Sequence, residues 1–218
     1  SKYQPRFNSV VTSGKDVVGM WKKAADKEGL HLGVASHFAR SYRWFQPSHR
    51  ADHSGPMAGV AYDGQNPEFS DLYGVKWKDD SSFPDFWYEQ RSDVGPPAFE
   101  KNFEDRLIDL MDKYHPDLYY TDGGIPFKQA GLNVLAHFYN ENQKWNNGRL
   151  QAVATIKLDW TPNVAINNYE YGYPDTVQHY PWQSDKTMGA DWYWIRNATS
   201  RYMSAQNAMH MLIDTVSK

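Results

Sequence analysis

The chain has 218 residues, no cysteine and a formal net charge of −3 at pH 7, which is enough length for one sizeable domain and excludes disulfide bonds. The mildly acidic balance, without a basic stripe, argues against binding to nucleic acid or to an anionic membrane surface. The sequence contains no run of about 18 apolar residues, which is the length that a helix needs to cross a bilayer. The first ten residues, SKYQPRFNSV, lack the apolar centre of a signal peptide, so the cellular location stays open.

Aromatic residues make up 16% of the chain, with nine tryptophans and fifteen tyrosines. Such an excess is typical of a site where flat apolar ring faces stack on sugar rings. An aromatic-rich core or an oligomer interface would need the same residues. Composition alone leaves the sugar-stacking site, the aromatic core and the oligomer interface all open.

The periodicity of apolar residues predicts helices that alternate with short β-rich strands. In chain order we expect a helix over 15–28, a strand over 31–36, a long polar segment over 46–97, a helix over 98–114, a strand over 117–121, a helix over 128–142, a strand over 150–156, a weaker strand over 176–180 and a helix over 196–217. Loops as long as the polar segment are usually functional, and its Trp77, Phe86 and Trp87 could line a binding subsite or an oligomer interface.

This alternation predicts an α/β fold with a parallel sheet and crossover helices in one domain over residues 1–218. About four strands are expected, whereas a complete (β/α)₈ barrel has eight and typically about 250 residues. The sequence therefore predicts a partial TIM-like barrel.

Two carboxylates stand out in this frame. The segment PDLYYTDGG (116–124) predicts a buried strand that delivers Asp122 to a glycine-rich turn, and NNYEYG (167–172) places Glu170 on a later polar loop. Two carboxylates among aromatic residues suit glycoside hydrolysis. The alternatives are a turn-forming role for an Asp before Gly-Gly and a solvated loop role for the Glu. Three further acidic residues compete for a catalytic role: Asp159, Asp175 and Asp185.

These motifs, with PWQSDKTMGADWYW (181–194) and HLGVASHFARSYRWF (31–45), resemble the retaining α-L-fucosidases of glycoside hydrolase family 29. The resemblance runs from Asn8 to Lys218. It implies that Asp122 is the nucleophile and Glu170 the general acid/base, with Tyr171 where the family often has Arg. It also implies a set of substrate-binding residues: His37, Trp44, Tyr120, Trp182 and Trp192.

The resemblance implies a retaining exo-α-L-fucosidase that acts on a fucosylated glycan or fucoside and needs no metal or cofactor. His49 and His53 are four residues apart, but no predicted helix places them together on a metal. Asn197-Ala198-Thr199 is a glycosylation sequon that matters only in a secreted eukaryotic protein.

The family's barrel has two strands that precede this part and later strands that follow it. Its His-His-Asp-Gly-Phe segment, which helps to bind fucose, has no counterpart here. A half-barrel would expose two sheet edges and an apolar inner face, so we expect a homo-oligomer, most simply a two-fold dimer. Two other interpretations stay open: a fucose- or glycan-binding module without turnover, and a fragment of a longer fucosidase.

Overall fold

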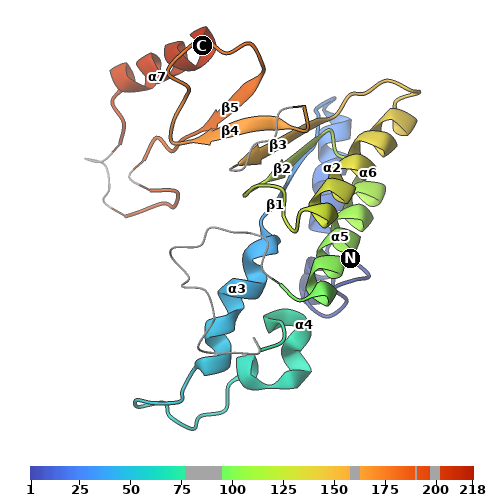
Figure 1. Cartoon of the computed structure of the whole chain (residues 1–218), viewed down its shortest axis with the longest axis vertical. Coiled ribbons are helices and arrows are strands. Elements are labelled where there is room, and N and C mark those ends of the chain that lie inside the picture. Colours follow the sequence, from blue (N-terminus) through green and yellow to red (C-terminus); the bar gives the residue numbers. More distant parts are fainter. Residues whose placement is uncertain (77–94, 158–162, 190, 197–201) are drawn as a thin grey trace.

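The computed structural model describes residues 1–76, 95–157, 163–189, 191–196 and 202–218. It has an α/β fold built on one parallel sheet, in which the strands lie in chain order (Figure 1). The strands are β1 Gly33–Ser36, β2 Leu118–Thr121, β3 Val153–Lys157, β4 Ile166–Glu170 and β5 Trp182–Asp185. Within the described ranges, β1 and β5 are the two edges of this sheet.

The helices agree with most of the predicted ones. The α-helices are α1 Ser9–Ser13, α2 Val17–Lys27, α3 Ser41–Phe45, α4 Ser70–Tyr73, α5 Pro97–Tyr114, α6 Gln129–Trp145 and α7 Ala205–Ser217. Short 3₁₀ helices lie at Phe38–Arg40, Gln46–Arg50, Asp63–Gln65 and Pro67–Phe69. The last helix begins later than predicted, because the hydroxyl of Ser204 caps it by accepting from the Asn207 amide.

Two expectations about the strands were wrong: residues 176–180 form no strand, and Glu170 ends a strand rather than lying in a loop. Where about four strands were expected, the described residues form a sheet of five. Asn and Asp disfavour strands, which concealed β4 (INNYE) and β5 (WQSD). Pairing with β3 overrides that preference, with Lys157 opposite Asn168, and β4 in turn pairs with β5.

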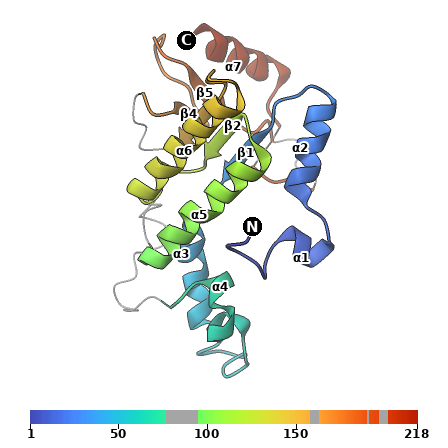
Figure 2. The ribbon, with the colours of Figure 1, turned by 90° about the vertical axis from the view of Figure 1, so that its right-hand side faces the viewer.

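Helices α5 and α6 lie side by side over one face of the sheet (Figures 1 and 2). The core between them is made of fully or almost fully buried side chains: Phe103, Leu107, Met111, Tyr119, Val134, Leu135, Phe138 and Ala154. The first turn of α6 lies directly on the loop that follows β2. A Cβ atom at Gly131 would lie 2.5 Å from the carbonyl oxygen of Pro126, so this close approach requires glycine.

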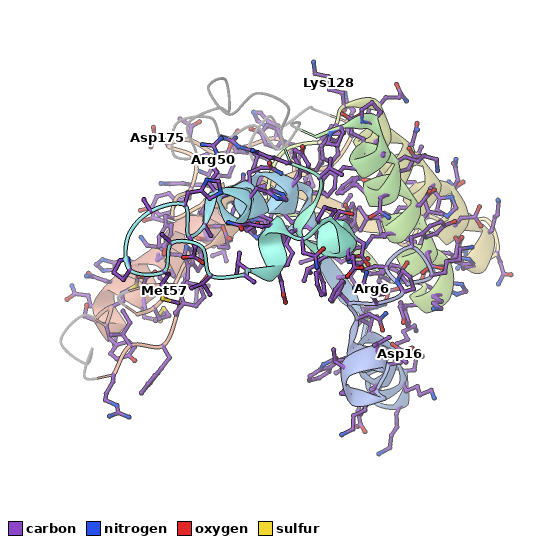
Figure 3. All side chains as sticks on the ribbon, turned by 90° about the horizontal axis from the view of Figure 1, so that it is seen from below. Arg6, Asp16, Arg50, Met57, Lys128 and Asp175 are labelled. Carbon is purple, nitrogen blue, oxygen red and sulfur yellow. The ribbon has the colours of Figure 1, made fainter. Side chains whose placement is uncertain are left out.

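The amino-terminal segment is fastened at two places. Arg6 forms an ion pair with Asp71 at 3.3 Å, which ties it to α4, and Asp16 caps α2 while accepting a 2.7 Å hydrogen bond from the Tyr114 hydroxyl of α5. Figure 3 labels Arg6 and Asp16 at these positions. No helix in the described part of the chain has the length and apolar character that crossing a membrane requires.

Candidate active site

The carboxyl ends of four strands bring polar side chains to one face of the sheet. Alternate residues of a strand point to the same face, and α5 and α6 cover the face to which Tyr119, Ala154 and Ile156 belong. The opposite face therefore receives the site residues. They come in pairs from successive strands: Tyr120 with Asp122, Thr155 with Lys157, Asn168 with Glu170, and Gln183 with Asp185. At this end of the sheet, the inner face is therefore polar, although an apolar inner face was expected.

Lys157, the last residue of β3, stands at the centre of the site. Its Nζ lies 2.8 Å from Asp122 Oδ1 and 2.9 Å from Glu170 Oε1. Asp185 Oδ2 is 3.8 Å away. One ammonium group therefore joins the two predicted catalytic carboxylates, which are 48 residues apart in the chain and converge because β2 and β4 flank β3.

The Lys157 side chain is only 9% exposed. Burial opposes its charge, but hydrogen bonds to Asp122 and Glu170 outweigh burial and raise the pKa of Lys157 well above its ordinary value. The ammonium group is therefore charged at any physiological pH.

Asn168 forms hydrogen bonds with two residues of the site, Asp185 and Tyr120. It is 3% exposed, and its side-chain amide donates to Asp185 Oδ1 at 2.7 Å and to the Tyr120 hydroxyl at 3.2 Å. Burial, with the nearby charge of Asp185, raises the pKa of Tyr120 to about 12. Tyr120 therefore presents a neutral hydroxyl group to the site.

His37 follows β1 and approaches the other oxygen of Asp122, with Nε2 at 3.3 Å from Oδ2. Its ring meets Trp44 edge to face at 4.8 Å between ring centroids. Burial lowers the pKa of His37 although Asp122 pulls it upward. The neutral imidazole is therefore favoured, and its N–H can donate to Asp122 or to a ligand hydroxyl.

Trp192 lies beside the cluster, as Trp44 and Tyr120 do, whereas the fourth predicted aromatic residue, Trp182, does not. The Trp192 ring centroid is 5.9 Å from Lys157 Nζ and 4.6 Å from the Tyr171 ring. Tyr171 turns the chain sharply after Glu170 with φ of 56°. Trp182 packs on Tyr169 instead, because both residues alternate with site-facing neighbours and so lie on the opposite face of the sheet.

The three rival carboxylates have different surroundings. Asp185 belongs to the cluster, Asp175 is exposed between β4 and β5, and Asp159 lies outside the described residues. Trp77, Phe86, Trp87 and the sequon at 197–199 also lie outside them. His49 and His53 line a cavity of about 470 Å³ beside α4. Nowhere in the described ranges do three or more His, Asp or Glu side chains gather as metal ligands.

Sequence reasoning missed Lys157 and Asn168. The signal for Lys157 was present, since a charged residue directly after a predicted buried strand is also what singled out Asp122. Asn168 carried no such signal, because its strand could not be recognised from residue preferences.

The parallel sheet, with helices on one face and polar residues where its strands end, defines part of a (β/α) barrel with its site at the carboxyl ends of the strands. The α-L-fucosidase family model matches residues 1–218, so the chain belongs to the α-L-fucosidase family, glycoside hydrolase family 29. A comparison with curated proteins found no match.

Solved α-L-fucosidases show the same fold. One α-L-fucosidase is 22% identical with a TM-score of 0.60 and covers 100% of this chain. Thermotoga maritima α-fucosidase in complex with a mechanism-based inhibitor is 24% identical, with a TM-score of 0.60 and the same coverage. The Thermotoga maritima α-L-fucosynthase in complex with a fucosyl-fucose azide is 22% identical with a TM-score of 0.61. The chain spans only 41%, 41% and 40% of these three proteins.

Proposed function

We propose that this chain forms the catalytic centre of a retaining exo-α-L-fucosidase, with Asp122 as nucleophile and Glu170 as general acid/base. The observation that carries the proposal is the shared contact of both carboxylates with Lys157 Nζ, at 2.8 and 2.9 Å. Because Asp122 Oδ1 and Glu170 Oε1 contact the same nitrogen atom, their separation cannot exceed the sum of these two distances. That limit fits the separation of about 5–5.5 Å in retaining glycosidases better than the about 6.5–9.5 Å of inverting ones.

The reaction would follow two displacements at the anomeric carbon. Asp122 forms a bond to that carbon while the glycosidic bond breaks and Glu170 gives its proton to the leaving oxygen. Glu170 then takes a proton from water, whose oxygen displaces Asp122 and releases fucose with its original configuration. His37 and Tyr120 lie where they could bond sugar hydroxyls, and Trp44 and Trp192 offer ring faces to the apolar parts of the sugar.

Trp182 was predicted to bind substrate, and its orientation gives no support to that role. Its ring lies against Tyr169 on the helix-facing side of the sheet. We therefore assign the aromatic contacts to Trp44 and Trp192 instead.

A homo-oligomer is part of the proposal. Within the described residues β1 and β5 each pair on one side only, and α7 exposes Met209, Leu212 and Ile213 by more than half. Open strand edges readily pair with other chains, so we expect a second copy of this chain to pair along one of these edges. Light scattering that finds a stable monomer at micromolar concentration would rule this out.

The decisive experiment is release of nitrophenol from an aryl α-L-fucoside. We expect turnover by the wild type, and a loss of about 10³-fold or more in Asp122→Asn, because the amide cannot form the glycosyl ester. Asp175→Asn is the matched control, since it removes an exposed carboxylate of the segment between β4 and β5, which Figure 3 labels. Initial release of the α-anomer, observed by proton NMR, would support retention. Saturable binding of fucose by a folded but inactive wild type would instead support a binding module.

A further inference from the structure

Lys157 is the last residue of β3 and belongs neither to a turn nor to the hydrophobic core. Its side chain is 9% exposed, and its ammonium group lies among three carboxylates at the ends of β2, β4 and β5. Among the described residues, the other groups near it include Tyr120, His37, Tyr171 and the Trp192 ring, and the charges of Arg40 and Asp191 act on His37 and Tyr171 in turn. The cluster thus holds three acidic groups and one permanent cation.

The two displacements move negative charge between Asp122 and Glu170. Before the first step, the nucleophile must be ionised and the acid protonated. After it, Asp122 is a neutral ester and Glu170 has become a carboxylate. The pair therefore carries one negative charge at either stage, and only the location of that charge changes.

We propose that Lys157 is the shared counter-ion of the two catalytic carboxylates, pairing with Asp122 before the first displacement and with Glu170 after it. The inference rests on the proposed function. Its basis is that Nζ already lies within hydrogen-bond distance of both oxygens, so the partner can change without movement of the lysine. Asp185, held by Asn168, stays beside the ammonium group throughout.

Without Lys157, the three carboxylates would face one another without the cation to which each of them is paired. Like charges at short range disfavour ionisation, so the nucleophile would lose its charge at a higher pH. The side chains would also separate, and small displacements of reacting groups can cost about 100-fold in rate. Lys157 is thus a positioning residue that acts through the two carboxylates.

The test compares Lys157→Met, Lys157→Arg and the wild type on the aryl fucoside across pH. We expect Lys157→Met to lose about 100-fold or more in kcat with little change in KM. The acidic limb of its pH profile should move upward by about one unit or more. Lys157→Arg keeps the charge and should recover at least about tenfold of the loss. Lys144→Met is the control, because that exposed lysine of α6 pairs with Glu141 and lies outside the cluster.

Two results would overturn the inference: a kcat of Lys157→Met within about threefold of the wild type, or a reduced kcat with an unmoved acidic limb and no recovery by Arg. If Lys157→Met does not fold, Lys157→Gln replaces it, since the amide can donate but carries no charge. If the wild type has no turnover, the proposed function fails separately. The carboxyl ¹³C titration of Asp122 then decides: a midpoint that moves upward in Lys157→Met supports the counter-ion role, and an unmoved midpoint refutes it.

Discussion

Phe138 of α6 offers the sharpest test of how the helices support the site. Its side chain is fully buried. The centroid of its ring lies 6.0 Å from the ring centroid of Tyr119 in β2 and 5.7 Å from that of Tyr139. Burial of such a ring contributes about 1.5–3 kcal/mol, and each aromatic pair adds about 0.5–1.5 kcal/mol. Phe138→Ala should therefore lower the free energy of unfolding by about 3–5 kcal/mol, the usual range for such a cavity.

The assay is urea denaturation followed by tryptophan fluorescence, supported by thermal melts. For a chain of this size, the loss corresponds to a fall in Tm of roughly 6–20 °C. Leu132→Ala is the matched control on the same helix, since Leu132 is 40% exposed and should cost no more than about 1 kcal/mol. If both variants lose the same stability, α6 does not pack on β2 through Phe138 and the reasoning is refuted.

Two further predictions concern the cap of α2 and the pH dependence of stability. Asp16→Ala removes the acceptor for the Gly19 amide and the Tyr114 hydroxyl, so the free energy of unfolding should fall by about 0.5–2 kcal/mol. Asp16→Asn keeps an acceptor and should lower it by less. Equal urea midpoints for the wild type and both variants would contradict this prediction. Because burial lowers the pKa of His37 below its ordinary 6.5, the unfolded chain binds the proton more readily, so stability should fall as pH drops from 6.5 through the folded-state pKa. In His37→Gln, the decrease in stability that comes from His37 should be absent. The prediction is refuted if the urea midpoint changes equally between pH 7.5 and pH 5 in the wild type and in His37→Gln.

The sequence by itself determined the helices with clear apolar periodicity and the strands made of β-branched and aromatic residues. Helices α2, α5 and α6 and strands β1 to β3 therefore lie where the pattern predicted them. The position of Asp122, directly after an apolar strand in a βα unit, needed only local information. The family resemblance rested on short motifs of the same local kind.

Tertiary structure decided what depends on neighbouring strands. The segments INNYE and WQSD are strands only because parallel partners supply their hydrogen bonds, and the register of that pairing sends Glu170 into the site and Trp182 away from it. Lys157 likewise became the centre of the cluster only when β2 and β4 came to flank β3. A strand shows each side chain to one of two faces, and which face meets the site is fixed by pairing rather than by residue type.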